Sequence, residues 1–386
     1  MIHLVKSTFY KEKETKQSLI DFISGASTLS MGKECAKFEK AFAKKQGRKY
    51  AVLVSSGSMA NLILVQAMMN LGMFKKGDRI GVSALTWATN IMPLLQLGLV
   101  PVILDVSRTT LNVTPEEVEK KLGKLKGLFI TNVLGLSDDI SKIEKLCKKH
   151  RVTLIEDNCE SLGSRTGGKL LGNFGIASTF SFFVGHHLST IEGGMVTTDD
   201  DILHEMLVLV RAHGWDRNLH PDRQKKLRRK HGHDEFHAKY IFHDLAYNAR
   251  PTEVTGFLGN TQLPHWNEIV KKRQSNFKRF ASAIEKNKDL VPLEYGHMDT
   301  VSNMAMPVLA VSRAQAEIYK KKFAPHVEIR PVIAGNMLNQ PFYKKYVSDL
   351  RRYDNAEFIH QNGFYFANNP ELTNEEVSLI VSLLSS

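Results

Sequence analysis

The stretch "KYAVLVSSGSMANLILVQAMMN" at residues 49–70 joins an apolar run, a turn of small residues and an amphipathic segment. This order predicts a buried β-strand, a tight turn and an α-helix. Serine and glycine let a backbone approach a ligand closely, and free N–H groups at the start of a helix favour anions. Gly57 and Ser58, in the centre of the turn, are therefore candidate phosphate-binding residues.

Five further apolar runs repeat this pattern. They are short and rich in β-branched or aromatic residues, and helix-like segments separate several of them. Continuous apolar runs that alternate with helices predict a mostly parallel sheet, buried on both faces. Ligands of such sheets bind beyond the carboxyl ends of the strands, so site residues should directly follow the runs. The runs are "DRIGVSALTW" (78–87), "LVPVILDV" (99–106), "GLFITNVLG" (127–135), "VTLIEDNCES" (152–161) and "STFSFFVG" (178–185).

The pattern changes after about residue 256. A long, basic, amphipathic segment predicts one helix at 265–287, and two strand-like runs and a closing helix follow it. The chain of 386 residues is long enough for one large domain with a smaller companion. We expect an N-terminal helical segment at 1–30 near the small domain, a large α/β domain at 31–256 and a small α+β domain at 257–386.

The composition is that of a soluble globular protein. Hydrophobic residues make up 42% and charged residues 24% of the chain. No apolar stretch approaches the roughly 18 residues that span a bilayer. The first 17 residues carry too many charges for a signal peptide. These features predict a cytoplasmic protein that does not bind membranes.

The formal net charge is +12, and "QKKLRRKHGH" at 224–233 is the most basic segment. We interpret it as a solvated loop, and attraction of an anionic substrate is the second reading. Binding of nucleic acid is disfavoured because neither aromatic stacking motifs nor helix-turn-helix or zinc-finger spacings accompany the charge.

Three cysteines, Cys35, Cys147 and Cys159, are widely spaced and form no CxxC pair. They predict neither a disulfide framework nor a zinc site, and an iron–sulfur cluster usually requires four. His231, His233 and His237 alternate with charged residues in "HGHDEFH", which favours a solvated loop over a metal site.

Polar or aromatic residues follow several of the runs. Trp87 is placed to pack at the rim or to stack on a flat ring. Asp157 and Glu160 end a very apolar run, where a carboxylate is costly unless it has a partner. Ser181 lies within the run at 178–185, and His186 follows it. A lone histidine at a strand end is usually structural, but this set resembles a pyridoxal phosphate site: a phosphate cradle, a stacking ring and a buried partner for the pyridine nitrogen.

The motifs resemble, in order and spacing, those of the DegT/DnrJ/EryC1/StrS sugar aminotransferase family over essentially the whole chain. They are "SSGSMAN" (55–61), "EDNCES" (156–161), "FSFFVGHHLSTIEGGMVTTDD" (180–200), "RAHGWDRNL" (211–219) and "YNARPTE" (247–253). The resemblance implies an α/β, aspartate-aminotransferase-like fold of pyridoxal phosphate fold type I. It also implies a homodimer with shared active sites.

One departure from the family pattern concerns His186. The family normally has a lysine here that binds the cofactor covalently, and this segment has none. A lysine-to-histidine change marks the sugar 3-dehydratases of the family. One branch acts on a CDP-linked 4-keto sugar and carries a four-cysteine iron–sulfur cluster. The other acts on GDP-4-keto-6-deoxy-D-mannose, on the route to colitose, and needs no cluster.

Three scattered cysteines make the chain similar to the second branch, with pyridoxal or pyridoxamine phosphate, no iron–sulfur cluster, a nucleotide sugar as substrate and L-glutamate as amino donor. The substitution has a chemical reason. A histidine with a pKa near 6.5 can move protons for the loss of a C3 hydroxyl, but it cannot hold the cofactor covalently.

The resemblance also assigns roles to individual residues. His186 is the catalytic residue; Gly57, Ser58 and Ser181 bind the phosphate, Trp87 stacks on the ring, Asp157 keeps the ring nitrogen protonated, and Glu160 bonds the phenolic oxygen. Asn248 is expected to reach the phosphate from the partner subunit. Arg250 either meets the donor carboxylate or forms a structural salt bridge, and His187 is expected to be structural.

Two alternatives stay open at the level of sequence. One is a nucleotide-sugar aminotransferase whose lysine has been changed to histidine. The other is a binding protein of the same fold without catalysis. Retention of Trp87, Asp157 and Ser181 speaks against the second alternative.

Overall fold

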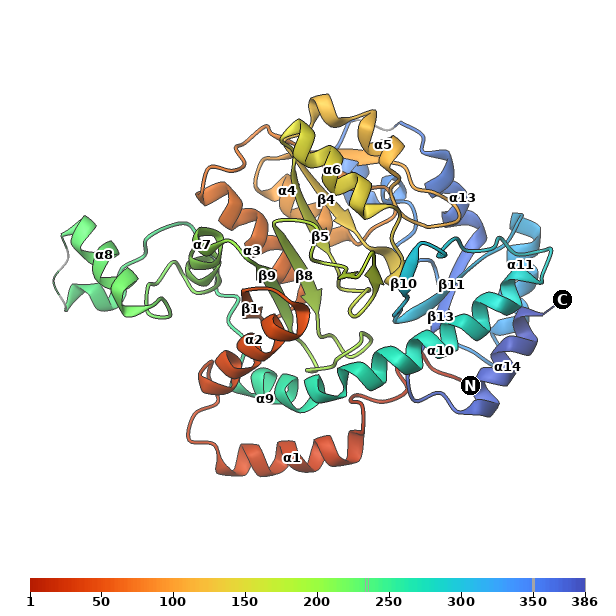
Figure 1. Ribbon diagram of the computed structural model, residues 1–386, viewed down its shortest axis with the longest axis horizontal. Coiled ribbons are helices and arrows are strands. Elements are labelled where there is room, and N and C mark those ends of the chain that lie inside the picture. The colour runs from red at the N-terminus through yellow and green to blue at the C-terminus, as the bar shows by residue number, and fades with distance from the viewer. Residues whose placement is uncertain (233, 235, 349–350, 386) are drawn as a thin grey trace.

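The computed structural model describes residues 1–386 except 233, 235, 349, 350 and 386. A seven-stranded sheet lies at its centre (Figure 1). The strand order is β1 (Tyr50–Val54), β9 (Gly194–Thr198), β8 (Ala177–Ser181), β5 (Thr153–Asp157), β4 (Gly127–Thr131), β2 (Arg79–Ser83) and β3 (Val100–Leu104). The β2–β3, β2–β4, β4–β5 and β5–β8 pairs are parallel, and β9 runs antiparallel to β1 and β8, which confirms the predicted, mostly parallel sheet.

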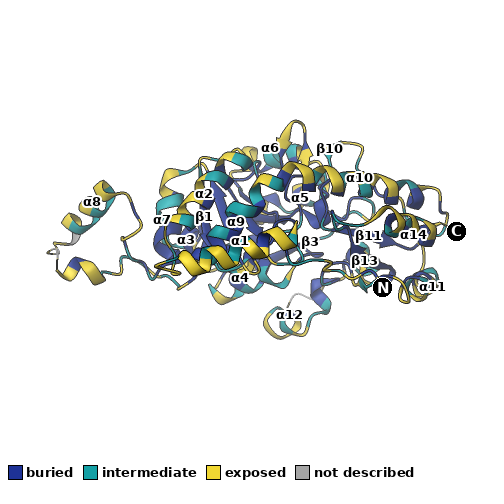
Figure 2. Ribbon diagram, turned by 90° about the horizontal axis from the view of Figure 1, so that it is seen from below, coloured by how far each residue is buried: buried dark blue, intermediate teal, exposed yellow. Residues whose placement is uncertain are grey.

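Helices surround this sheet, so its strands are buried. The helices α3 (Gly57–Asn70) and α7 (Asp201–Arg211) pack together against β9, while α2 (Lys33–Gln46) packs on β1 and on α9 (Glu253–Gln262). Figure 2 shows the buried sheet between exposed helical surfaces. The helices of this part are α2 (Lys33–Gln46), α3 (Gly57–Asn70), α4 (Met92–Gln96), α5 (Pro115–Glu119), α6 (Ile140–His150), α7 (Asp201–Arg211), α8 (Pro221–His231) and α9 (Glu253–Gln262).

The C-terminal part is built on a small antiparallel sheet of β11 (Ala305–Leu309), β13 (Gly363–Ala367) and β12 (Ile329–Arg330). A third sheet joins β10 (Met298–Thr300) to the hairpin β6 (Arg165–Thr166) and β7 (Lys169–Leu170). The helices are α10 (Trp266–Glu285), α11 (Arg313–Phe323), α12 (Pro341–Tyr346), α13 (Asp354–Asn362) and α14 (Asn374–Leu384).

The N-terminal helix is α1 (Glu12–Gly25), which packs on α9 through stacked rings of Phe22 and Phe257, 4.2 Å apart. Residues before it run along the C-terminal part, where Ile2 pairs with Val327. The predicted boundary between residues 256 and 257 falls inside α9. The division into three units stays a prediction.

The prediction of a loop at 224–233 is wrong for its first part, because residues 221–231 form the helix α8. Pro221 opens this helix, and Gly232 ends it in the left-handed conformation with φ 66°. These start and stop residues outweigh the run of like charges. The helix lies away from the main body (Figures 1 and 2). His233 of "HGHDEFH" lies outside the described residues.

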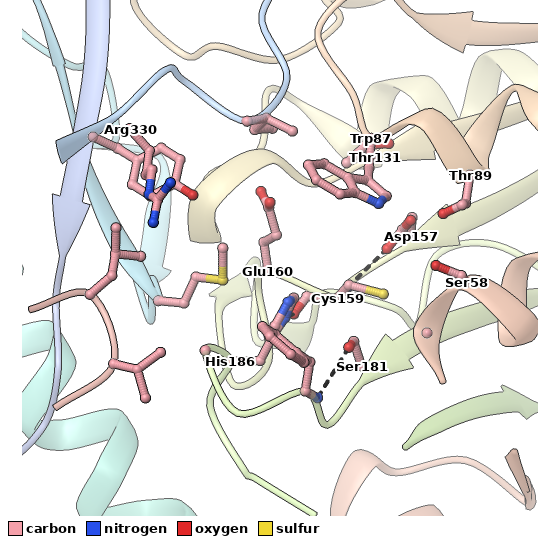
Figure 3. A pocket seen from close by; sticks show the side chains of 18 of the residues that line it. Ser58, Trp87, Thr89, Thr131, Asp157, Cys159, Glu160, Ser181, His186 and Arg330 are labelled. Atoms are coloured by element: carbon pink, nitrogen blue, oxygen red, sulfur yellow. Dashed lines mark hydrogen bonds between the residues drawn. The ribbon is translucent and has the colours of Figure 1, made fainter. Parts of the chain in front are cut away.

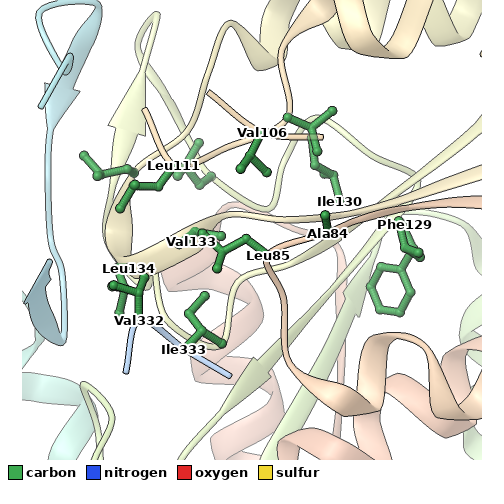
Figure 4. Close-up of a cluster of buried hydrophobic side chains, with 14 of the residues drawn as sticks. Ala84, Leu85, Val106, Leu111, Phe129, Ile130, Val133, Leu134, Val332 and Ile333 are labelled. Atoms are coloured by element: carbon green, nitrogen blue, oxygen red, sulfur yellow. The ribbon is translucent and has the colours of Figure 1, made fainter. Parts of the chain in front are cut away.

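A buried apolar cluster joins the central sheet to the C-terminal part (Figure 4). Leu85 follows β2 and Leu134 follows β4, and both belong to the same core as Val332 and Ile333, which follow β12. All four side chains are at most 7% exposed. This packing fixes the carboxyl ends of β2 and β4 against the C-terminal part, and Ile333 also lines the cavity described next.

Candidate active site

A cavity of about 520 Å³ opens beyond the carboxyl ends of β5 and β8 (Figure 3). The start of α3 and the rim residue Trp87 border it, while Arg330 lies on the side opposite Ser58 and Thr89. It is lined by His3, Leu4, Val5, Gly57, Ser58, Asn61, Trp87, Thr89, Thr131, Asp157, Cys159, Glu160, Ser181, Phe183, Gly185, His186, Met304, Glu328, Arg330, Ile333 and Tyr365. Of the site residues expected from the sequence, seven line this cavity, namely Gly57, Ser58, Trp87, Asp157, Glu160, Ser181 and His186, whereas Asn248 and Arg250 do not.

The first turn of α3 forms one wall of the cavity. Ser56 caps this helix by accepting a hydrogen bond from the backbone N–H of Met59 at 3.1 Å. A Cβ atom at Gly57 would lie only 2.7 Å from the Cβ of Ser181. Glycine at this position therefore brings the helix start against Ser181, and Gly57, Ser58 and Ser181 together border a space suited to an anion.

Asp157 is buried, with 3% of its surface exposed. Its carboxylate accepts hydrogen bonds from the amides of Asn61 (3.0 Å) and Asn90 (2.8 Å) and from the backbone N–H of Cys159 (2.9 Å). All three donors are neutral. Since a buried carboxylate is costly without a positive partner, Asp157 can accept a cation that enters the cavity.

Glu160 lines the same cavity and accepts one hydrogen bond, at 3.0 Å, from the backbone N–H of Leu134. Burial raises the pKa of the Glu160 carboxyl to about 8, and the nearby Asp157 charge adds to this rise. The Glu160 carboxyl is therefore mostly protonated at neutral pH and can donate a hydrogen bond into the cavity.

His186 follows β8 and lies on the cavity beside Glu160 and Cys159 (Figure 3). Its Nδ1 is 2.5 Å from the carbonyl oxygen of Cys159, and because a carbonyl can only accept, Nδ1 carries a proton. Burial lowers the pKa of the His186 imidazole. A neutral imidazole with a protonated Nδ1 leaves the lone pair of Nε2 free to accept a proton.

His187 does not line this cavity. It is 4% exposed, and its Nε2 donates to the carbonyl oxygen of Ser302 at 2.9 Å. Burial lowers the pKa of His187 well below its ordinary value. These contacts agree with the structural role expected for His187.

Trp87 lies at the rim of the cavity and is 52% exposed, as a side chain that covers a ligand would be. Asn248 and Arg250 are also exposed, but neither lines the cavity of its own chain. The Nε atom of Arg250 donates to Oδ1 of Asn248 at 3.0 Å. The structure therefore does not bring these two residues to the other site residues within one chain.

Sequence reasoning missed several residues of the site. Asn61 and Asn90 hold Asp157. Asn61 ends the quoted segment "SSGSMAN" and Asn90 stands three residues after Trp87, so their proximity to the strand ends was a usable signal. His3, Arg330 and Tyr365 come from distant parts of the chain. No local pattern marks these three as neighbours of the cavity.

The model of the DegT/DnrJ/EryC1/StrS aminotransferase family matches residues 10–385. The chain belongs to this family. The GDP-4-keto-6-deoxy-D-mannose 3-dehydratase of Yersinia pseudotuberculosis is 32% identical over 393 residues, covering 98% of this chain and 97% of that protein.

Solved structures of the family agree with this match. The E. coli GDP-4-keto-6-deoxy-D-mannose 3-dehydratase with bound hydrated PLP has a TM-score of 0.88 and 30% identity, over 100% of this chain and 99% of that one. A GDP-4-keto-6-deoxymannose 3-dehydratase with a trapped PLP–glutamate geminal diamine has a TM-score of 0.89 and 30% identity over the full length of both chains. The expected aspartate-aminotransferase-like fold is confirmed.

Three further features bear on metal ligands, cysteine reactivity and membrane spans in this chain. Within the described ranges, no three His, Cys, Asp or Glu side chains come together as a metal site. Burial raises the pKa values of the Cys35 and Cys147 thiols to about 12, so both are protonated at neutral pH. No helix among the described residues is long and apolar enough to cross a membrane.

Proposed function

We propose that this chain is a pyridoxamine phosphate-dependent 3-dehydratase of a nucleotide-linked 4-keto-6-deoxy sugar. The substrate that best fits its relatives is GDP-4-keto-6-deoxy-D-mannose, with L-glutamate as amino donor. The observation that carries the proposal is His186, a neutral imidazole with a free Nε2 on the cavity, at the position where the family normally has a lysine.

The residues of the cavity fit pyridoxal or pyridoxamine phosphate. Gly57, Ser58 and Ser181 border a helix start suited to the phosphate. Asp157 has neutral donors only, so a protonated pyridine nitrogen would supply the positive partner that this carboxylate requires. Trp87 would cover the ring, and a protonated Glu160 would donate to its phenolic oxygen.

When bound, the cofactor supplies an amino group that condenses with the C4 ketone and a ring that accepts electrons. Asp157 holds the proton on the ring nitrogen and so preserves that capacity. Nε2 of His186 takes up a proton beside the ring, and the imidazolium then returns a proton to the departing C3 hydroxyl, which leaves as water. The bond from Nδ1 of His186 to the Cys159 carbonyl keeps the ring oriented during both transfers.

A histidine at this position cannot bind the cofactor covalently, as the lysine of an aminotransferase does. The amino group of the cofactor is therefore not left on the sugar by that route. Hydrolysis instead releases ammonia and the 3-deoxy ketosugar. The amino donor then restores the amine for the next turnover. Such a product would be a precursor of 3,6-dideoxysugars such as colitose, which are used for lipopolysaccharide O-antigen. The reaction would take place in the cytoplasm.

The proposal is tested by measuring ammonia release with glutamate and a panel of GDP-, CDP-, UDP- and dTDP-linked 4-keto-6-deoxy sugars. We expect ammonia in proportion to the 3-deoxy product, with the GDP-linked sugar preferred. Transfer of nitrogen to the sugar without free ammonia would identify an aminotransferase. Binding without turnover of any sugar would identify a non-catalytic protein.

We further propose a homodimer in which Asn248 reaches the phosphate of the neighbouring site and Arg250 meets the donor carboxylate. Exposure of both residues away from their own cavity supports this arrangement. Sedimentation at working concentration should give a dimer, and a monomer that turns over would refute the shared site. Turnover should also survive removal of iron, because the three cysteines lie far apart in the sequence.

A further inference from the structure

Arg273, on α10, is a buried arginine that binds the loop carrying His186. It is 3% exposed. Its Nη2 donates to the carbonyl oxygen of His186 at 3.1 Å. Its Nη1 donates to the carbonyl oxygens of Asn303 (3.3 Å), Met304 (3.1 Å) and Asn368. One guanidinium therefore joins the loop after β8 to the segments before β11 and after β13.

Every one of these partners is a neutral carbonyl. Among the residues that the structure describes, no carboxylate forms an ion pair with Arg273, and burial lowers the pKa of its guanidinium to about 9. The side chain is thus still mostly charged at neutral pH. A buried cation without a carboxylate partner is costly, although a neutral donor could form the same hydrogen bonds to these carbonyls.

The position of this charge matters for the imidazole of His186. Of the groups that face His186, Asp157 is negative and raises its pKa, while Arg273 is positive and lowers it. Glu160 is mostly protonated at neutral pH, burial holds the Cys159 thiol protonated, and His187 is neutral. Arg273 is therefore the cation that opposes Asp157 at this histidine.

We propose that Arg273 is a positioning residue of the active site, which fixes the His186 loop to the C-terminal part and places a positive charge without a carboxylate partner near the imidazole. The charge opposes protonation of His186, so that Nε2 can accept a proton while Asp157 stays charged nearby. Only the expected effect of Arg273 on the rate of dehydration rests on the proposed function. The state of the imidazole is measurable without turnover.

The test compares Arg273→Gln with Arg273→Lys in the full-length protein, with and without cofactor. The titration of ¹⁵N-labelled His186, assigned by its loss in His186→Asn, should have a midpoint below 6.5 in the parent. Removal of the charge in Arg273→Gln should raise the midpoint. Arg273→Lys keeps the charge but lacks the planar guanidinium that bonds several carbonyls at once. The midpoint of the His186 titration should therefore stay at the parent's value, while the rate of single-turnover dehydration should fall roughly tenfold.

A control for loss of an arginine from the same helix is Arg279→Gln, since Arg279 is exposed and bonds only the Ser378 hydroxyl at 3.2 Å among the contacts described for it. It should change neither the midpoint nor the rate. Equal midpoints in the parent and in Arg273→Gln would overturn the proposal. If Arg273→Gln does not fold, Arg273→Lys decides: an unchanged rate or a raised midpoint would overturn it.

The two hypotheses fail in different ways. A chain that releases no ammonia but shows the Arg273-dependent midpoint would refute the dehydratase activity and leave the role of Arg273 intact. A chain that releases ammonia with an Arg273-independent midpoint would do the reverse.

Discussion

Two neighbouring carboxylates at the end of β5 lie in contrasting surroundings. Glu156 accepts four hydrogen bonds, from the backbone N–H groups of Gly172, Phe174 and Gly175 and from the amide of Asn132. Asp157 accepts three and lines the cavity. Side chains alternate between the faces of a strand, so one residue serves the loop at 172–175 while the next serves the cavity.

The same contrast separates His186 from His187. We call Asp157 and His186 the cavity pair, and Glu156 and His187 the packed pair. The side chains of the packed pair form hydrogen bonds with backbone groups in loops, such as those of Gly172 and Ser302. The cavity pair lines the cavity, where a ligand can reach the Asp157 carboxylate and Nε2 of His186. Glu156 also has neutral donors only, and Nδ1 of His187 has no partner among the described residues, but neither side chain lines the cavity. The difference indicates that neither burial nor incomplete pairing marks a functional residue by itself, and that access to the cavity is also required.

The largest effect is expected for His186. His186→Asn should bind pyridoxamine phosphate nearly as well as the parent, because the phosphate cradle and Asp157 remain, but dehydration should fall on the order of 10²–10⁴-fold. His186→Lys should instead hold pyridoxal phosphate covalently, in a form that borohydride traps, and lose dehydration. Single-turnover rates and borohydride trapping measure both. Normal turnover of His186→Asn would mean that His186 is not the proton-transfer residue.

Asp157→Asn should have the second largest effect on the rate of dehydration. The amide keeps the shape of the side chain but removes the charge, so the ring nitrogen loses its proton and the rate should drop on the order of 10²–10³-fold. Cofactor affinity should weaken as well. Absorbance titration with pyridoxal phosphate and single-turnover kinetics would show both effects. If both values stay at those of the parent, the carboxylate has no role in holding the cofactor.

Glu156→Gln should change stability and spare the rate. The amide leaves at least one buried N–H of the 172–175 loop without an acceptor, which should cost about 1–3 kcal/mol of the free energy of unfolding. Urea denaturation measures this loss, and ammonia release measures the rate under conditions where the variant is folded. A large loss of rate in a stable Glu156→Gln protein would erase the distinction between the two pairs.

The smallest effect is expected for His187→Asn, which should leave turnover within about tenfold of the parent, or 1.4 kcal/mol. Its signature is pH dependence. The folded-state pKa of His187 lies below its unfolded value near 6.5, so only the unfolded chain gains a proton as pH falls below 6.5.

Stability linked to His187 is therefore fully present above pH 6.5 and declines below it, by at most about 1.4 kcal/mol per pH unit. His187→Asn should reduce this decline, measured as the free energy of unfolding between pH 6.5 and 5.5. An unchanged slope in His187→Asn would show that this histidine is not buried in its neutral form.

Much of the architecture could be predicted from local patterns. Apolar runs and small-residue turns predicted β1, α3 and the strands that carry Trp87, Asp157 and His186, because strand and helix periodicities are properties of short windows. The rule that ligands meet the carboxyl ends of parallel strands then placed these residues at one site. The segment at 224–233 shows the limit of composition, since a proline and a glycine at its ends gave a helix where charge suggested a loop.

The sequence by itself determined the alternation of strands and helices in the central sheet, the strand-end positions of the polar residues and the lysine-to-histidine departure. Only the tertiary structure decided that Asn61 and Asn90 hold Asp157, that Cys159 orients His186, and that Arg273, 87 residues further along the chain, binds the same loop. The physical reason is that such contacts are set by the packing of whole elements, which brings distant backbone groups together without a repeating local pattern.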